Sequence, residues 1–375
     1  MFNLLLGIIS SKAFFENINI ILLIIFCPLI IYIAWKKDKI LVSKNLILII
    51  GFAVSYYIIS MFYEIDVSKI SIACVLSYYI GMMLIEISKN KEKSVITYTY
   101  SIAIGFFIHA MANYIINIGT QDRNTIDIWT GVGRSATLQA TMLTMIMGSS
   151  FYSLVALKNK LYKLIITIFI ILSLSYNLIL GTRTLIIVSV VSFIVSCITF
   201  IILNRRNIFL VLKNGKTLLI VIIVIFLVFI SNFMGIREKI ENTKLLRRIN
   251  KPYSTEEADE NRVQTLFLAF NSILEHPMGG NNERIGELKY AHNMWLDVGK
   301  QAGIIPFVLL SVFTIISLWN VIKIFKNEKF SNEFKVFLAG IYSAVLLNMA
   351  VEPIMQGEPL FFIMFCMIIG MVDNV

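Results

Sequence analysis

The chain has 375 residues, of which 58% are hydrophobic and only 15% are charged, and its formal net charge is +10. A soluble chain usually carries about a quarter charged residues, so this chain has too few charges to cover a soluble surface. The composition also excludes a disordered chain, a collagen and a small disulfide scaffold. Its long, charge-poor apolar runs are typical of a polytopic membrane protein.

Apolar runs of about 17–25 residues predict an all-α transmembrane bundle of roughly eleven spans, with a range of about 10–12. Residues 2–9 are apolar but too short to cross. They are expected to form an interfacial helix, a re-entrant piece or part of a short span with 13–16. No cleavage signature follows them, so no removable signal peptide is expected. The predicted spans lie near 18–35, 45–63, 68–88, 95–118, 136–157, 161–180, 184–203, 217–235, 303–323, 334–351 and 359–373.

The basic residues predict the orientation of these spans. The connections that follow the first, third, fifth, seventh and ninth spans hold 18 of the 33 lysines and arginines. The short connections on the other side hold Lys69, Arg123, Arg134 and Arg183. The positive-inside rule therefore places the first set in the cytoplasm. Most of the positive charge is a topology signal, and no basic cluster interleaved with aromatic residues indicates nucleic-acid binding.

This orientation places one long segment, 236–302, outside the cytoplasm. It carries ten basic and ten acidic residues, turn sequences and helix-like stretches such as 263–274. Long ordered loops are usually functional. The predicted organisation is an N-terminal bundle at 1–235 with about eight spans, an outer loop at 236–302, and C-terminal membrane helices at 303–375.

Three arginines on the predicted outer side are candidates for an anion site. Arg183 lies in a hairpin of about four residues between two spans, close to hydrocarbon, where a cation is costly. Arg262 opens an amphipathic stretch that follows the acidic run 256–260. Arg134 lies at the mouth of the span 136–157. The alternatives are a snorkelling interfacial cation for Arg183, a salt bridge to the acidic run for Arg262 and an interfacial anchor for Arg134. Guanidinium groups match phosphate oxygens bidentately, so together these arginines suit a pyrophosphate.

The chain has three histidines, and His292 is the candidate for chemistry. It lies where the long segment re-enters the membrane, and on a helix it would share a face with Leu296, Gly299 and Gly303. His109, inside a span, is interpreted as a packed or helix-bonded residue. His276, before a proline, is interpreted as a turn residue.

Metal chemistry is not expected. The carboxylates of 256–260 are interpreted as a solvated acidic loop, and no His/Cys ligand spacing, phosphate-binding glycine loop or nucleophile elbow occurs. The four cysteines, which all lie in apolar spans, are expected to be buried hydrophobes without a disulfide framework. They are Cys27, Cys74, Cys197 and Cys366.

Three motifs, in this order along the chain, resemble the O-antigen ligase and O-antigen polymerase superfamily. The first is similar to its short arginine motif, the second to its arginine-led periplasmic helix with a Pro–x–Gly turn, and the third to its histidine motif. They cover about 180–305, whereas the first 130 residues contribute only hydropathy. The matching residues are Gly181–Thr184, Arg262–Ile273 with His276–Gly280, and Ala291–Asn293 with Leu296, Gly299 and Gly303.

The resemblance implies an inverting glycosyltransferase of the bacterial inner membrane that needs no metal or other cofactor and acts at the periplasmic face. It implies a glycan on undecaprenyl pyrophosphate as donor, a glycolipid acceptor and, as a further partner, a chain-length regulator. Carried over to this sequence, Arg183 and Arg262 bind the pyrophosphate, with Arg134 as a weaker addition. His292 becomes the general base or positions the acceptor hydroxyl.

The favoured reading is a polymerase of O-antigen or capsular repeat units, because a single Ala–His–Asn–x–x–Leu motif and a compact loop resemble polymerases. The alternative is a ligase that moves the glycan onto lipid A–core. A glycolipid flippase or transporter is a second alternative, although such proteins usually carry midplane ionisable residues and repeats. A non-catalytic scaffold or receptor would leave the placement of the three motifs unexplained.

Overall fold

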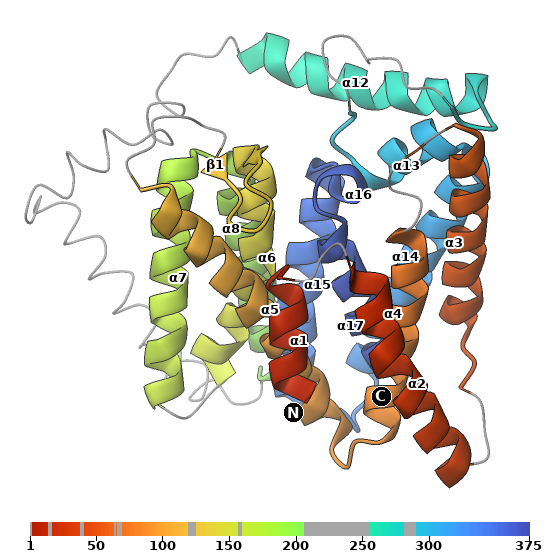
Figure 1. Cartoon of the computed structure of the whole chain (residues 1–375). Helices are drawn as coiled ribbons and strands as arrows, with labels where there is room; N and C mark the ends of the chain where they lie inside the picture. The colour runs from red at the N-terminus through yellow and green to blue at the C-terminus, as the bar shows by residue number, and fades with distance from the viewer. Residues whose placement is uncertain are drawn as a thin grey trace, which may run out of the picture. The chain divides into compact units, whose positions relative to one another are not determined.

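A computed structural model describes residues 2–13, 17–37, 41–63, 65, 70–118, 125–156, 160–205, 255–280 and 290–375. These residues are almost entirely helical (Figure 1). The predicted span at 217–235 lies outside them. A small exception to the all-α prediction is a two-stranded hairpin, β1 (Thr125–Ile126) with β2 (Gly133–Arg134), paired antiparallel with Thr125 opposite Arg134.

Every predicted span inside the described residues corresponds to a helix. Six of these helices are long and apolar enough to cross a membrane, and they indicate a membrane-embedded protein; the total of eleven spans stays a prediction. The helices at the predicted spans are α2 (Ile18–Lys37), α3 (Lys44–Phe62), α4 (Ile70–Glu86), α5 (Lys91–Ile116), α6 (Ala136–Ala156), α7 (Lys160–Leu180), α8 (Arg183–Leu203), α14 (Ile304–Lys326), α15 (Asn332–Val351) and α17 (Pro359–Asp373). The six are the segments Lys44–Phe62, Lys91–Ile116, Leu161–Leu180, Arg183–Leu203, Ile304–Lys326 and Asn332–Val351.

Within the described residues, four further helices lie between or before these spans. They are α1 (Phe2–Ser10), α12 (Thr255–Glu275), α13 (Met294–Ala302) and α16 (Ile354–Gly357). Helix α12 confirms the helical prediction for 263–274. Helix α16 was not expected, and it follows the span that ends at Val351.

The chain forms two compact units. Unit 1 comprises 1–102, 254–328 and 349–375, and unit 2 comprises 103–253 and 329–348. The predicted division at residues 235 and 302 follows the order of membrane crossings and stays a prediction.

In unit 1, α17 is the central helix, because every residue from Pro359 to Val372 is buried. It packs most extensively on α4. A Cβ on Gly81 would overlap the backbone of Met367, and one on Gly370 would overlap that of Tyr78. Small residues of this kind let membrane helices approach backbone to backbone.

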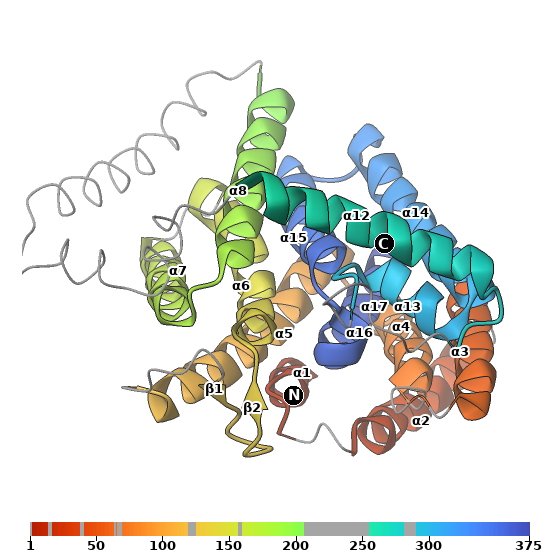
Figure 2. The same cartoon turned by 90° about the horizontal axis from the view of Figure 1, so that it is seen from above.

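At one end of unit 1, α12 runs crosswise above α13 (Figures 1 and 2). The buried side of α12 carries small residues, among them Ala269, while Phe267 and Phe270 on the other side are exposed. Gly299 on α13 permits this packing, since a Cβ there would lie 2.5 Å from Cδ1 of Ile273.

The turn after α12 is joined to the junction of α13 and α14 by backbone hydrogen bonds. Ile304 N–H donates to the carbonyl of Pro277 at 2.9 Å, and Gly280 N–H donates to that of Gln301 at 2.8 Å. Gly303 ends α13 with φ of 85°, a conformation that favours glycine. A Cβ on Gly303 would overlap the Pro277 carbonyl. The backbone therefore packs closely at both Gly299 and Gly303, where a side chain would not fit.

Gly303→Ala is expected to destabilise unit 1 by about 2–4 kcal/mol, because strain at positive φ adds to a backbone clash. Thermal unfolding of the purified protein in detergent measures this loss. Gly51→Ala is the matched control, since its Cβ would make ordinary contact with Leu309 at 3.5 Å. Equal melting temperatures for the two variants would contradict the expectation.

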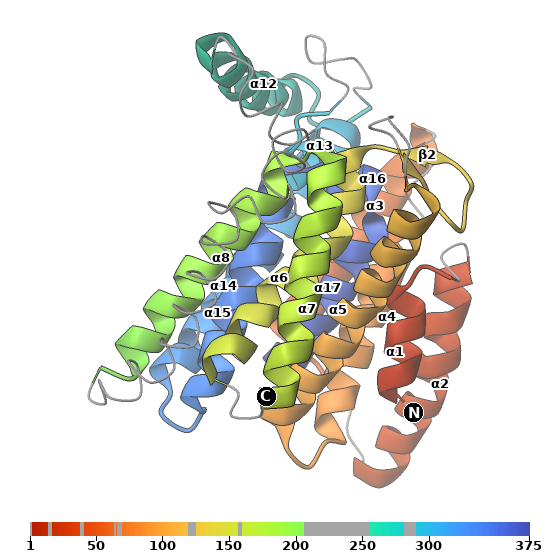
Figure 3. The same cartoon turned by 90° about the vertical axis from the view of Figure 1, so that its left-hand side faces the viewer.

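In unit 2, α6 packs against both α7 and α8 (Figure 3). The part of α15 that belongs to this unit approaches α6 closely: a Cβ on Gly148 would lie 2.6 Å from Cβ of Ala344. Ser192 on α8 donates to the carbonyl of Gly340 at 3.1 Å. Helices α7 and α8 are joined by a two-residue turn that places Arg183 at the start of α8.

Candidate functional site

His292 lies in the turn that precedes α13, not on the helix. The expectation that it shares a helical face with Leu296, Gly299 and Gly303 is wrong, because α13 begins only at Met294. His292 has φ of 54°, in the left-handed region that few side chains other than Gly, Asn, Asp and His visit. Its side chain is 39% exposed, so the imidazole is accessible while its backbone is constrained.

The carboxylate of Asp297 holds the backbone on both sides of His292. Its Oδ1 accepts the N–H of Ala291 at 2.6 Å, and its Oδ2 accepts the N–H of Asn293 at 3.1 Å. Such charge-assisted hydrogen bonds are about twice as strong as neutral ones. They offset the strain of the left-handed residue between them, and a buried aspartate thereby fixes the direction of the histidine.

Asn293 joins the same turn to two other elements. Its Oδ1 accepts the N–H of Leu296 at 3.2 Å and caps α13, as asparagine commonly does. Its Nδ2 donates to the carbonyl of Ala350 near the end of α15, at 3.2 Å. The histidine motif is thus attached to the chain segment that leads into α16.

A buried glutamate from that segment faces the histidine. Nδ1 of His292 lies 3.8 Å from Oε2 of Glu352, whose side chain is 3% exposed. Nε2 of Gln356 on α16 donates to Oε1 of Gln301 on α13 at 3.0 Å, so a side-chain hydrogen bond joins the helices that follow Glu352 and His292.

Burial raises the pKa of Asp297 to about 6, although the N–H donors of Ala291 and Asn293 act in the opposite direction. The folded carboxyl binds its proton more tightly than the unfolded one. The free energy of unfolding should therefore fall as pH rises from about 4 to about 6, by up to about 3 kcal/mol. Above that range the carboxylate is ionised, and it accepts both N–H groups that hold His292.

The expected result is that the melting temperature of the parent protein falls relative to that of Asp297→Asn as pH rises from about 4 to about 6. Asparagine has no proton to lose in this range, so the variant lacks this contribution. Thermal unfolding of both proteins at several pH values tests it. Two curves that stay parallel would show that Asp297 does not titrate in this window.

Arg262 lies in α12, which packs on α13 within unit 1. The structure describes its backbone but not its side chain, so the predicted contact with a pyrophosphate stays a prediction. The same holds for the acidic run 256–260, whose side chains lie outside the described part.

Arg183 is the first residue of α8, and its side chain is exposed. The turn before it is tightly built: Gly181 has φ of 68°, and Asn177 accepts from the hydroxyl of Thr182 while its Nδ2 donates to the Thr182 carbonyl at 3.0 Å. A cation at a helix N-terminus opposes the helix dipole, whereas an anion there is favoured. The charge of Arg183 therefore does not stabilise α8. Its position suits the binding of an anion.

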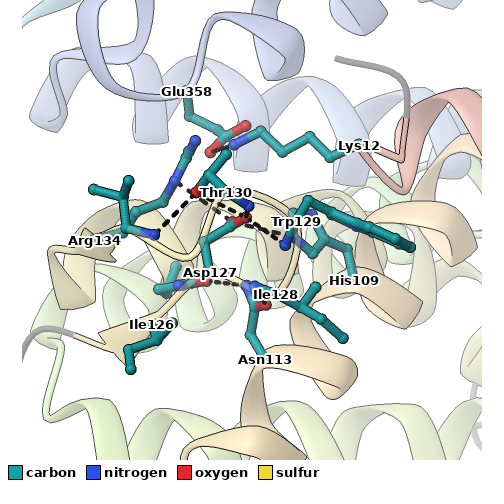
Figure 4. A network of polar contacts seen from close by, with 12 residues as sticks. Lys12, His109, Asn113, Ile126, Asp127, Ile128, Trp129, Thr130, Arg134 and Glu358 are labelled. Atoms are coloured by element: carbon teal, nitrogen blue, oxygen red, sulfur yellow. Dashed lines mark hydrogen bonds and ion pairs between the residues drawn. The ribbon is translucent and has the colours of Figure 1, made fainter. Parts of the chain in front are cut away.

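Arg134 belongs to a hairpin network in unit 2 (Figure 4). Its Nε lies 3.5 Å from Oδ2 of Asp127, and its side chain is 17% exposed. His109 Nε2 lies 3.1 Å from the same oxygen. The interpretation of His109 as a packed residue omitted this partner, because Asp127 lies in a loop that sequence spacing does not relate to the helix. Arg134 thus has a structural partner besides its proposed ligand.

Two asparagines attach this hairpin: Asn113 near the end of α5 and Asn117 one residue beyond it. Asn113 Oδ1 accepts the N–H of Ile128 at 2.9 Å, and Asn117 Oδ1 accepts that of Ile126 at 2.8 Å. The Asn117 N–H still donates to the Asn113 carbonyl at 3.2 Å, so the two residues lie one helical turn apart.

Unit 1 contains a buried ion pair that the sequence did not predict. Nζ of Lys12, two residues beyond α1, lies 2.6 Å from Oε2 of Glu358 at the start of α17, and both side chains are buried (Figure 4). Helix α1 covers Phe2–Ser10, and the choice among the three alternatives for residues 2–9 stays a prediction. Two Glu–Pro dipeptides in an apolar segment, at 352 and 358, were the available signal for both buried carboxylates.

The structure assigns the predicted site residues to two units: Arg262 and His292 to unit 1, and Arg134 and Arg183 to unit 2. Among the described residues, no group of three His, Cys, Asp or Glu side chains is placed to hold a metal ion. All four cysteines are free, but Cys27 is exposed, so the expectation that every cysteine is buried is wrong there.

The sequence was also compared with known proteins. No family model matches it, and no curated protein matches it either.

Proposed function

We propose that this chain is a metal-independent, inverting glycosyltransferase that uses a glycan on undecaprenyl pyrophosphate as donor and polymerises polysaccharide repeat units. The observation that carries the proposal is the environment of His292. An accessible imidazole stands on a left-handed backbone that Asp297 holds from both sides, next to the buried Glu352. Residues that their surroundings hold in a strained backbone conformation cluster at functional sites.

The chemistry needs few components. The acceptor hydroxyl attacks the anomeric carbon from the face opposite the pyrophosphate, and the neutral imidazole takes the hydroxyl proton, a contribution worth about 10²–10⁴-fold. The pyrophosphate is already a good leaving group. Arg183, at the start of α8, and Arg262 supply positive charge for the oxygens that become more negative as it departs.

The proposed setting is the bacterial inner membrane, with His292 at the periplasmic face. The six long apolar helices support the membrane location. Lys323 and Lys326 in the last turn of α14, with Lys329 just beyond it, support a cytoplasmic side at that end of the helix.

The full-length chain in lipid nanodiscs, supplied with an undecaprenyl-pyrophosphate-linked repeat unit and EDTA, tests this proposal. We expect lipid-linked glycans of two or more repeats together with free undecaprenyl pyrophosphate. No transfer, or transfer only with a divalent ion, would contradict it. In cells, deletion separates the two closest activities: a single repeat on lipid A–core indicates a lost polymerase, and full chains held on the lipid carrier indicate a lost ligase.

A second candidate is a glycolipid flippase, which the two buried ion pairs favour. His109 with Asp127 in unit 2 and Lys12 with Glu358 in unit 1 are ionisable groups buried inside the protein, as transporters often carry. Movement of the lipid-linked glycan across vesicles containing the purified chain, with no transfer to an acceptor, would favour the flippase.

A further inference from the structure

The two buried glutamates of the segment between α15 and α17 have different partners. Glu352 precedes Pro353 and faces an accessible histidine. Glu358 precedes Pro359 and is paired with the buried Lys12 at 2.6 Å. Glu358 has the short, enclosed geometry of a structural ion pair. The side chain of His292, the partner of Glu352, is 39% exposed, which a structural pair does not require.

The two ring nitrogens of His292 have different roles in this geometry. Nδ1 is directed at Oε2 of Glu352 at 3.8 Å. A carboxylate on this side favours the tautomer whose proton is on Nδ1, so Nε2 is left as the acceptor. Catalytic hydrogen bonds are often long before substrate binds and shorten in the reacting complex.

Hydrogen bonds hold the backbone close to both partners. The Asp297 carboxylate fixes the backbone on both sides of His292, and Asn293 ties the turn to the Ala350 carbonyl, two residues before Glu352. The geometry therefore defines a carboxylate–imidazole pair built from two chain segments that are 60 positions apart in the sequence.

Building on the proposed glycosyl transfer, we infer that Glu352 is the positioning residue for His292: it selects the tautomer with Nε2 free and stabilises the imidazolium that forms during transfer. The acceptor O–H proton moves to Nε2. The oxygen's electron pair forms the new glycosidic bond, and the bond between the anomeric carbon and the pyrophosphate oxygen breaks with its pair on the leaving group. The imidazolium then carries a proton on each nitrogen, and the Glu352 carboxylate balances its charge.

The expected effect of Glu352→Gln is a fall in kcat of about 10–100-fold with little change in KM for the lipid-linked donor. The variant keeps the size of the side chain and loses its charge. The acidic limb of the kcat–pH profile should move towards lower pH, because the imidazolium has lost an opposite charge. Glu352→Asp, which keeps the charge, should recover part of kcat and return the limb towards its original position.

Glu358→Gln is the matched control. It also removes a buried carboxylate next to a proline, but its partner is Lys12. It should lower the melting temperature and leave the acidic limb in place. A Glu352→Gln protein with parental kcat, or one whose limb does not move, would overturn the inference.

A second measurement does not depend on activity. The rate at which diethyl pyrocarbonate modifies His292 reports the neutral imidazole at each pH. The background variant His276→Gln removes the exposed histidine after α12, and His109 is buried. Glu352→Gln should move the midpoint of this rate to lower pH, whereas an unchanged midpoint would contradict the pair. Among the described residues, the other charged or titratable groups around the turn are Asp297 and Lys300 on α13, Tyr290 in the same loop and Tyr56 on α3, and all of them are present in both proteins.

The outcomes separate this inference from the proposed function. If His292→Ala transfers glycan at the parental rate, the catalytic assignment fails and the pair has no role. If His292→Ala is inactive while Glu352→Gln matches the parent, only the inference about Glu352 fails.

Discussion

His292→Ala should lower the rate of glycan chain growth at least about 100-fold, the usual contribution of a general base. Among the described residues of unit 1, His292 is the only histidine beside a buried carboxylate on the predicted outer side. The variant loses this imidazole. The measurement is glycan length on the lipid carrier, by gel and mass spectrometry, for the purified chain and for cells. Normal long-chain product would contradict the assignment.

Two controls separate the imidazole from the backbone. Alanine is strained at φ of 54°, a conformation that costs about 1–2 kcal/mol for residues other than Gly, Asn and Asp. His292→Asn tolerates this conformation, so it should fold like the parent and still be inactive. His276→Ala removes an exposed histidine at the end of α12 and should leave chain growth unchanged.

The second large effect is expected at Arg183. Arg183→Lys keeps the positive charge but loses the planar fork that binds phosphate oxygens bidentately. It should raise KM for the lipid-linked donor, or lower kcat/KM, by about 10–100-fold. A steady-state assay with varied donor concentration measures this change.

The opposite end of the same helix provides the control. Arg205 is exposed two residues beyond the end of α8, on the side predicted to be cytoplasmic. Arg205→Lys should leave the kinetics unchanged. If Arg183→Lys is equally silent, Arg183 is a simple interfacial cation and the pyrophosphate assignment is lost.

Hydropathy predicted the helices well because a backbone surrounded by lipid must satisfy its N–H and C=O groups internally, as the hydrogen bonds of a continuous helix do. Predicted spans and observed helices agree within a few residues, as for 45–63 and α3 (Lys44–Phe62). The helix after His292 shows the limit. Periodicity through 292–303 favoured one continuous helix. Instead, the Asn293 side chain caps α13, and the Asp297 carboxylate accepts the N–H groups of Ala291 and Asn293 in the turn before it.

The site partners were harder to predict. Spacing along a helix finds neighbours three or four residues apart, whereas Glu352 is 60 residues from His292 and Asp127 lies 18 residues from His109 in a loop. Only the packing of separate chain segments brings such groups together. Composition still offered a signal, since a buried glutamate in an apolar segment needs a partner.

The shortness of α17 has a consequence for competing water. Its 15 residues extend about 22 Å at about 1.5 Å per residue, less than the roughly 30 Å hydrocarbon thickness of a bilayer. If α17 crosses the bilayer, as its hydropathy predicts, a neighbouring segment must share the hydrocarbon thickness, and Glu352 and Glu358 in the segment before it are buried in protein. Under the proposed function, the buried Glu352 would then work where bulk water is scarce. Hydrolysis of the activated donor would then be suppressed by position, and the sugar hydroxyl brought by the acceptor would be the nucleophile most often present.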